Sequence, residues 1–295
     1  METVSDSSAS VVADSKIRKF EQFLRLVFRP RSAKAGALII GALILMVILG
    51  ILFWPLSPTA TGLPNLPPSS AHLFGTDFQG SDIFSEVVWG ALPSLGVALY
   101  AAFASVMIGF IVGISAGYYD RLGTVLGGTT DMVMAIPTFP LLIVIGLILL
   151  ASNELIGVVL VVVLWAPVAR AVRAQVLSVK KFAFVDSAKT SGLNDRQVIF
   201  KVIFFEVAPL AIAYFVSALA LNIVLVTSLQ FIGMGNALEV TWGSILYWAQ
   251  QYGFNSGDWW WIVLPGLIIT LTTAGFGLLG FSLEEIANPR LRAEH

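Results

Sequence analysis

The sequence predicts an all-α membrane protein with six transmembrane helices and both termini in the cytoplasm. Three observations support this prediction: the composition, the length of the apolar segments and the placement of the positive charges. Of the 295 residues, 57% are apolar and 12% are charged, and the mean hydropathy is +0.86. A soluble domain carries about 25% charged residues. A chain with half that fraction lacks the charged surface that a soluble fold of this size needs.

Six segments are long and apolar enough to cross a bilayer, which requires about 20 residues in a helix. They are residues 35–56, 91–117, 125–150, 155–177, 209–232 and 261–283. Several contain Pro, Gly or a charged residue, so their ends are expected to shift by a few residues.

The 17 Lys and Arg residues test this topology. Positive residues accumulate in cytoplasmic loops because they are translocated poorly. With the N-terminus inside, all 17 fall on the cytoplasmic side, and the outer segments 57–90, 151–154 and 233–260 contain none. The predicted organisation is a disordered tail (1–15), an amphipathic interfacial helix (16–34), the first transmembrane helix (35–56), an extracytoplasmic loop (57–90), a transmembrane bundle (91–283) with a cytoplasmic loop (178–208), and a cytoplasmic tail (284–295).

The sequence contains few groups that could support catalysis. It has no cysteine, no GxxxxGK[ST] phosphate-binding motif, no HExxH motif, and only His72 and His295 as histidines. We therefore expect no catalytic residue and no metal ligand, and the pattern does not identify substrate-binding residues. The alternatives to a transport permease are an intramembrane enzyme or a solitary secondary transporter. Either would be expected to place ionisable groups at mid-membrane, whereas the candidate charges can all reach an interface.

The cytoplasmic loop 178–208 has the local signals of two short helices. Residues Phe184–Lys189 can be helical, and Gly192 suits a helix C-terminus because glycine accepts a left-handed conformation. Asn194 or Asp195 can then cap a second helix over residues 196–206. From spacing alone, two interpretations remain open: an ordinary amphipathic connector, or a lever that passes the motion of a docked partner to the bundle.

Proline and glycine mark two further features of the predicted bundle. Pro137 and Pro140 interrupt the third segment, which is consistent either with a bend used in gating or with a static kink. Gly109, Gly113 and Gly117 recur at every fourth position of the second segment, a spacing that favours close packing of helices.

The loop motif Asp186-Ser187-Ala188-x-x-x-Gly192 resembles the EAA-x-x-x-G loop of ATP-binding-cassette (ABC) importer permeases. The resemblance covers about residues 30–292. Within the dipeptide/oligopeptide/nickel class, the chain is similar to the second permease of the pair. Further matching stretches are His72–Asp77, Ala116–Tyr119, Trp165–Arg173, Phe231–Gly235 and Asn288–Arg290. The chain departs from the family in having Asp186 and Ser187 where Glu and Ala are usual.

The resemblance implies a type I importer permease fold in a multi-pass protein of the inner or plasma membrane. Its docking loop for the ATPase would comprise Phe184, Asp186, Ser187, Ala188, Gly192 and Asp195. The implied partners are a homologous second permease, one or two ATP-binding subunits, an extracytoplasmic substrate-binding protein and membrane lipid, with no nucleic acid. ATP and Mg would act in the partner subunits, with no cofactor in this chain. The implied cargo is di- or oligopeptides, with oligosaccharides or nickel as alternatives.

Overall fold

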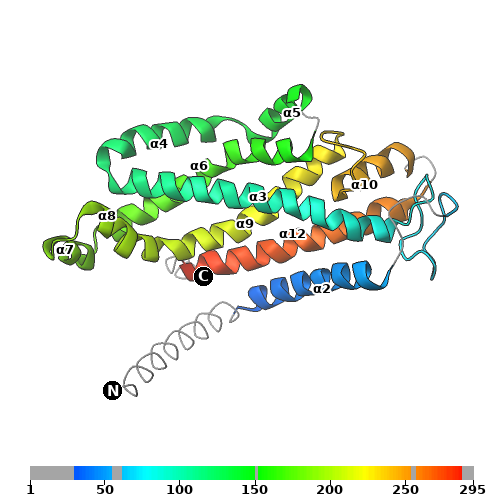
Figure 1. The fold of residues 1–295 in the computed structure, drawn as a ribbon, viewed down its shortest axis with the longest axis horizontal. Helices are drawn as coiled ribbons and strands as arrows, with labels where there is room; N and C mark the ends of the chain where they lie inside the picture. The colour runs from blue at the N-terminus through cyan, green and yellow to red at the C-terminus, as the bar shows by residue number, and fades with distance from the viewer. Residues whose placement is uncertain (1–29, 55–61, 150–151, 254–256, 288–295) are drawn as a thin grey trace, which may run out of the picture.

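The computed structural model describes residues 30–54, 62–149, 152–253 and 257–287, which form an all-helical bundle (Figure 1). The longest helices are α2 (Arg31–Phe53), α3 (Ile83–Tyr118), α6 (Asn153–Val179), α9 (Phe204–Phe231) and α12 (Trp259–Ala287). Five helical spans in the described residues are long and apolar enough to cross a membrane, and a sixth follows if α4 (Asp120–Ala135) and α5 (Thr138–Leu149) count as one. The predicted all-α membrane fold is confirmed.

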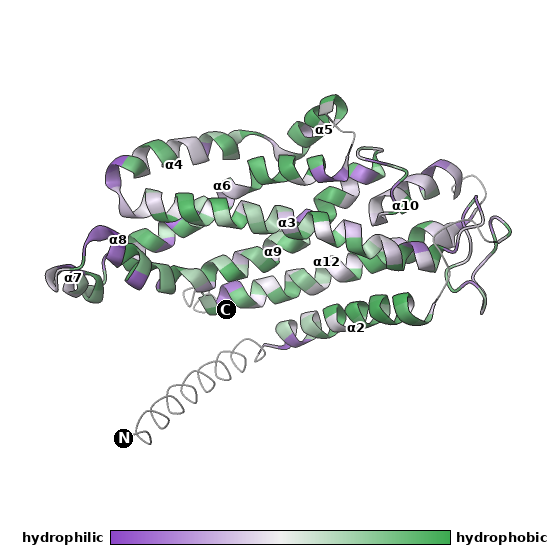
Figure 2. Ribbon diagram, viewed as in Figure 1, coloured by the Kyte–Doolittle hydropathy of each residue, from purple (hydrophilic) through white to green (hydrophobic). Residues whose placement is uncertain are grey.

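The hydropathy of the bundle suits a bilayer. Apolar residues cover the middle of the long helices, and polar residues gather towards the two ends (Figure 2). Many large apolar side chains lie on the outside, including Leu38 on α2 and Ile111 on α3, which are 74% and 59% exposed. Helices that are apolar all round require an apolar environment on every side.

The glycine row of α3 packs directly on α6. A Cβ atom at Gly109 would lie 2.6 Å from the carbonyl oxygen of Trp165, and one at Gly113 would lie 2.6 Å from the Cβ of Val172. Gly117 faces Val176 in the same way. The backbones of α3 and α6 therefore approach too closely for any side chain larger than hydrogen, which confirms the predicted packing role of these glycines.

Helix α3 starts earlier than the sequence predicts, and the third span has the interruption that its prolines predict. Helix α3 begins at Ile83, eight residues before the predicted start at 91, because the side chain of Asp82 accepts the N–H of Ser85 and caps the helix. The third span is not continuous: α4 ends at Ala135, Pro137 follows, and α5 leaves at an angle of 77°. Proline disfavours a helical conformation in the residue before it, which explains the break.

The ends of the predicted segments shift in other places. Residues 31–34, expected in the interfacial helix, form the first turn of α2, and α12 extends into the expected tail as far as Ala287. The predicted disordered tail and residues 16–29 of the predicted interfacial helix lie outside the described residues.

The two ends of the bundle differ in sequence and in shape. The loop over residues 62–82 and helix α10 (Trp242–Trp248) lie at one end, and α7 (Ala183–Thr190) and α8 (Asp195–Val198) lie at the other (Figure 1). The segments 35–120 and 202–289 contain no Lys or Arg. The end that carries α7 is therefore the basic end, and the end that carries α10 has no fixed positive charge.

Candidate functional site

Helix α7 projects from the basic end of the bundle, between α6 and α8 (Figure 1). Val185 in α7 and Val198 in α8 are completely buried in the same apolar cluster as Val176 and Val179 of α6. This cluster also contains residues of α3 and α9. The short helix is thus fixed to the core through one face rather than hanging from the bundle as a loose loop.

The turn after α7 has the geometry that the sequence predicts. Gly192 adopts a φ of +87°, and its N–H donates to the carbonyl oxygen of Lys189 at 3.0 Å. The N–H of Leu193 donates to the carbonyl oxygen of Ala188 at 3.2 Å. These two bonds form a Schellman motif, which ends a helix on a left-handed residue.

Asn194, and not Asp195, caps the second helix. The side chain of Asn194 accepts the N–H of Gln197 at 2.9 Å, and the side chain of Gln197 accepts the N–H of Asn194 at 3.0 Å. The helix that follows begins as α8, continues as a π-helical segment, η1 (Ile199–Ile203), and joins α9. A π-helical segment appears mostly as a single turn inserted in a longer helix and often at functional sites.

Tyr118, the last residue of α3, connects the turn to the bundle. Its hydroxyl donates to Oδ1 of Asp195 at 2.6 Å, and its carbonyl oxygen accepts from Nζ of Lys180 at 2.8 Å. The amino groups of Lys180 and Lys189 lie 5.6 and 5.4 Å from the centre of its ring. Tyr118 thus contacts Lys189 of α7, Asp195 of α8 and Lys180 at the end of α6.

Tyr118 and Lys180 were not identified as site residues from the sequence. The available signal was weak: a tyrosine at the end of an apolar segment and a lysine after another one. Their contact joins positions 62 residues apart in the chain, and no local spacing rule predicts such a pair.

The outward face of α7 presents apolar and acidic groups together. Phe182 and Phe184 are 47% and 44% exposed, and their ring centroids lie 5.7 Å apart. Asp186 and Ser187 are also exposed, whereas Ala188 is partly buried. Exposed aromatic side chains at the polar end of a membrane protein are typical of a surface that contacts another protein.

The other singled-out residues do not join this site. Pro137 stands at the break between α4 and α5, and Pro140 lies in the first turn of α5. Arg170 of α6 forms an exposed ion pair with Asp131 of α4. Among the described residues, no group of three or more His, Asp or Glu side chains is placed to hold a metal ion.

At the opposite end, a buried polar network ties α6, α9 and the segment before α10 together. Asn153 donates from Nδ2 to Oε2 of Glu239 at 2.6 Å and accepts from Nε2 of Gln230 at 3.0 Å. The hydroxyl of Thr241 donates to Oε1 of Gln230 at 3.1 Å. The network fixes the position of α10, which starts at the next residue.

Comparison with known proteins agrees with this architecture. Residues 105–293 match the family described as "binding-protein-dependent transport system inner membrane component". The chain is 33% identical to the dipeptide transport system permease protein of Bacillus subtilis, over 91% of this chain and 85% of the relative. It is 29% identical to the oligopeptide transport system permease protein of Haemophilus influenzae (91% and 88%), and 28% identical to the glutathione transport system permease protein of Pectobacterium atrosepticum (96% and 95%).

The family match covers more than half of the chain, and the similarity to the B. subtilis permease extends over nearly all of it. The bundle has five or six apolar spans, and α7 is fixed to its core on one face. Both features fit a multi-pass membrane component of such a system. The chain belongs to the family of inner membrane components of binding-protein-dependent transport systems.

Proposed function

We propose that the chain is a permease subunit of an ABC importer that passes di- or oligopeptides, delivered by an external binding protein, across the membrane by alternating access. The observation that carries this proposal is the construction of α7, which is exposed on one face and fixed to α3 and α6 on the other. The printed names of the relatives refer to dipeptides, oligopeptides and glutathione. These names support a peptide cargo over the oligosaccharide and nickel alternatives.

The basic end of the bundle is the cytoplasmic end in this proposal. The sequence places every Lys and Arg either outside the apolar spans or near this end, and positive residues are retained inside. Both termini are then cytoplasmic. The outward face of α7, with Phe182, Phe184 and Asp186, docks on an ATP-binding subunit, which supplies ATP and Mg.

The proposed transport cycle uses the contacts around Tyr118. Closure of the ATP-binding subunits moves α7 and α8, and the contacts of Tyr118 with Lys189 and Asp195 pass this motion to α3. A ligand shifts a two-state equilibrium only by its differential affinity for the two states, so ATP acts by stabilising the state in which the docked helices are closer. A homologous permease completes the pathway, and this chain is the second permease of that pair.

We assign the gating bend to Pro137. The helix breaks at Pro137, whereas Pro140 lies in the first turn of α5, where proline fits because the N–H groups there have no helical partner.

Substitution of Gly192 tests the docking role. Gly192→Arg places a long charged side chain in open space at the exposed turn, because no atom lies within 4 Å of a Cβ built there. We expect the complex to assemble and hydrolyse ATP, but peptide uptake into proteoliposomes to fall at least tenfold because the turn no longer seats in its partner. Gly192→Ala is the control, because it imposes the same left-handed backbone with little added bulk. Wild-type uptake by Gly192→Arg would refute the docking assignment.

Co-purification tests the partners. A tagged chain extracted in mild detergent should bring with it a second permease, an ATP-binding subunit and a binding protein. Recovery of the chain alone would favour a solitary transporter.

A further inference from the structure

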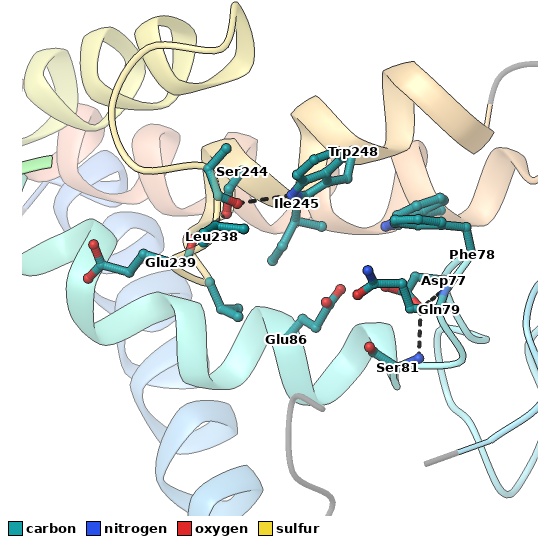
Figure 3. A pocket seen from close by; sticks show the side chains of 13 residues that line it. Asp77, Phe78, Gln79, Ser81, Glu86, Leu238, Glu239, Ser244, Ile245 and Trp248 are labelled. Atoms are coloured by element: carbon teal, nitrogen blue, oxygen red, sulfur yellow. Dashed lines mark hydrogen bonds between the residues drawn. The ribbon is translucent and has the colours of Figure 1, made fainter. Parts of the chain in front are cut away.

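A pocket of about 330 Å³ opens at the end of the bundle opposite α7. It lies between the start of α3, the loop that precedes α3, and α10 with the segment before it (Figure 3). The carboxylates of Asp77, Glu86 and Glu239 line it together with the aromatic side chains of Phe78, Trp248 and Trp261. We call this the outer pocket.

Glu86 points into the outer pocket from the first turns of α3 (Figure 3). The side chain is partly exposed, and its carboxylate faces the pocket. It makes no hydrogen bond or ion pair with any residue that the structure describes. The charges of Asp77 and Asp82 lie close enough to repel a charge on Glu86.

The neighbouring carboxylates, in contrast, already have partners. Oδ1 of Asp77 accepts the N–H groups of Gln79 and Ser81 at 2.8 and 2.6 Å. Asp82 caps α3 and contacts Nδ1 of His72 at 2.8 Å. Glu239 accepts from Asn153. Within the described part of the chain, Glu86 is therefore the carboxylate of the outer pocket that has no hydrogen-bond partner.

The chain cannot supply a strong positive partner at this end. Residues 35–120 and 202–289 contain no Lys or Arg, and residues 122–169 contain none either. His72 is engaged by Asp82. A carboxylate without a positive partner stays charged at a cost or takes up a proton. Because this end of the chain has no Lys or Arg, a cation that pairs with Glu86 comes from a molecule outside the chain.

The walls of the pocket suit an organic cation rather than a metal ion. The ring of Phe78 stacks on Tyr252 with centroids 4.2 Å apart and lies 6.0 Å from Trp248 and 5.8 Å from Trp261. Aromatic faces attract ammonium groups and shield them from water. A metal ion would need several converging oxygen ligands, and the described residues contain no such group.

We propose that the outer pocket binds the N-terminal ammonium group of the incoming peptide, with Glu86 as its anionic partner and the Phe78–Trp248 cluster as its apolar wall. This inference rests on the proposed function, because it places the pocket on the external side, where a binding protein releases a peptide. Every unmodified linear peptide carries this ammonium group at neutral pH, so such a site would accept peptides with little regard for their side chains.

The test uses the assembled permease–ATPase complex in nanodiscs, without the binding protein, so that ligand selection by that protein does not contribute. Unfolding midpoints are measured against increasing alanyl-phenylalanine and against N-acetyl-alanyl-phenylalanine, which lacks the ammonium group. A ligand that binds the folded state raises the midpoint according to its affinity. We expect the wild type to bind the free-amine peptide about tenfold or more tightly than the acetylated one, as expected for a charge-assisted contact.

Three variants test whether Glu86 causes the preference for the free-amine peptide. Glu86→Gln should abolish it, and Glu86→Asp should retain part of it because the charge remains. Glu154→Gln, which removes an exposed carboxylate near the start of α6 at the same end, should keep it in full. An unchanged preference in Glu86→Gln, or no preference in the wild type, would overturn the proposal. So would weaker binding of the binding protein to Glu86→Gln with an unchanged peptide preference, because the pocket would then receive a basic side chain of that protein.

A separate measurement distinguishes the two levels of the argument. Peptide uptake driven by the binding protein is measured in proteoliposomes of the same preparation. Absence of uptake in the wild type would contradict the proposed function itself. Uptake without an ammonium preference in the nanodisc assay would overturn only the role of Glu86.

Discussion

Gly113→Ala should destabilise the bundle, although alanine is the better helix former. In the structure the new Cβ would lie 2.6 Å from the Cβ of Val172 and 2.7 Å from the carbonyl oxygen of Ala169. Ordinary contacts begin at 3.4 Å, so α3 and α6 would have to separate locally by about 0.8 Å. Neither neighbouring atom can move by a side-chain rotation. Overpacking of this kind costs about 1–3 kcal/mol, and the gain in helix propensity offsets up to ~1 kcal/mol of it.

Gly96→Ala is the matched control on the same helix. No atom lies within 4 Å of a Cβ at Gly96, so this variant should keep only the propensity gain of roughly 0.5–1 kcal/mol. The two variants should therefore differ by about 1–3 kcal/mol in the free energy of unfolding. The assay is thermal unfolding of the purified chain in detergent, in which each kcal/mol shifts the midpoint by about 2–4 °C in a chain of comparable size. Equal midpoints for the two variants would refute the close-packing argument.

Three other perturbations follow from the geometry. Tyr118→Phe keeps the ring near Lys180 and Lys189 but removes the hydrogen bond to Asp195, and should lower the free energy of unfolding by about 1 kcal/mol. The ratio of ATP hydrolysed to peptide transported should rise. An unchanged ratio would contradict the role of Tyr118 in coupling. Asn194→Ala removes the reciprocal cap of α8 and should lower stability by about 1 kcal/mol, read as a lower unfolding midpoint, whereas Asn194→Asp should not. Burial raises the pKa of the Asp77 carboxyl above its usual value, although the N–H groups of Ser81 and Gln79 oppose this shift. The folded state then binds the proton more tightly than the unfolded state, so this residue's contribution to stability falls as pH rises from 3.8 through the folded pKa. Asp77→Asn keeps the Oδ1 acceptor and should flatten that part of the stability profile, and an identical profile in the variant would show that Asp77 is not its source.

The turn after α7 could be predicted from the sequence because its signals are local. Gly192 and Asn194 each specify backbone geometry within four residues, and both behave as expected. The close packing at the glycine row of α3 could also be predicted from the sequence, because the spacing of these glycines places them on one face of the helix. Asp195 shows the limit of this reasoning. It was an equal candidate for the cap, and only the position of Tyr118, from another helix, explains its actual contact.

Other features of the fold and the site depend on tertiary contacts, or are not visible in the hydropathy of the sequence. The start of α3 was placed too late because Glu86 and Asp82 lower the apolar character of its first turns. The same Glu86 lines the outer pocket, and its carboxylate has no hydrogen-bond partner among the residues that the structure describes. Pro137 and Pro140 predict the interruption of the third span, but neither the prolines nor the hydropathy gives the size of the bend, 77°. The network of Asn153, Gln230 and Glu239 joins positions up to 86 residues apart, beyond any local pattern.

The attachment of α2 has a consequence for the order in which the protein is made. Helix α2 packs mainly along α12 (Figure 1). There, a Cβ at Gly36 would lie 2.6 Å from the carbonyl oxygen of Gly275, and the hydroxyls of Ser32 and Ser282 are 2.9 Å apart. Because α2 precedes α12 in the chain, α2 is synthesised before the helix that is its main packing partner. A nascent chain that stops before α12 leaves Gly36 and Ser32 without the helix that packs on them.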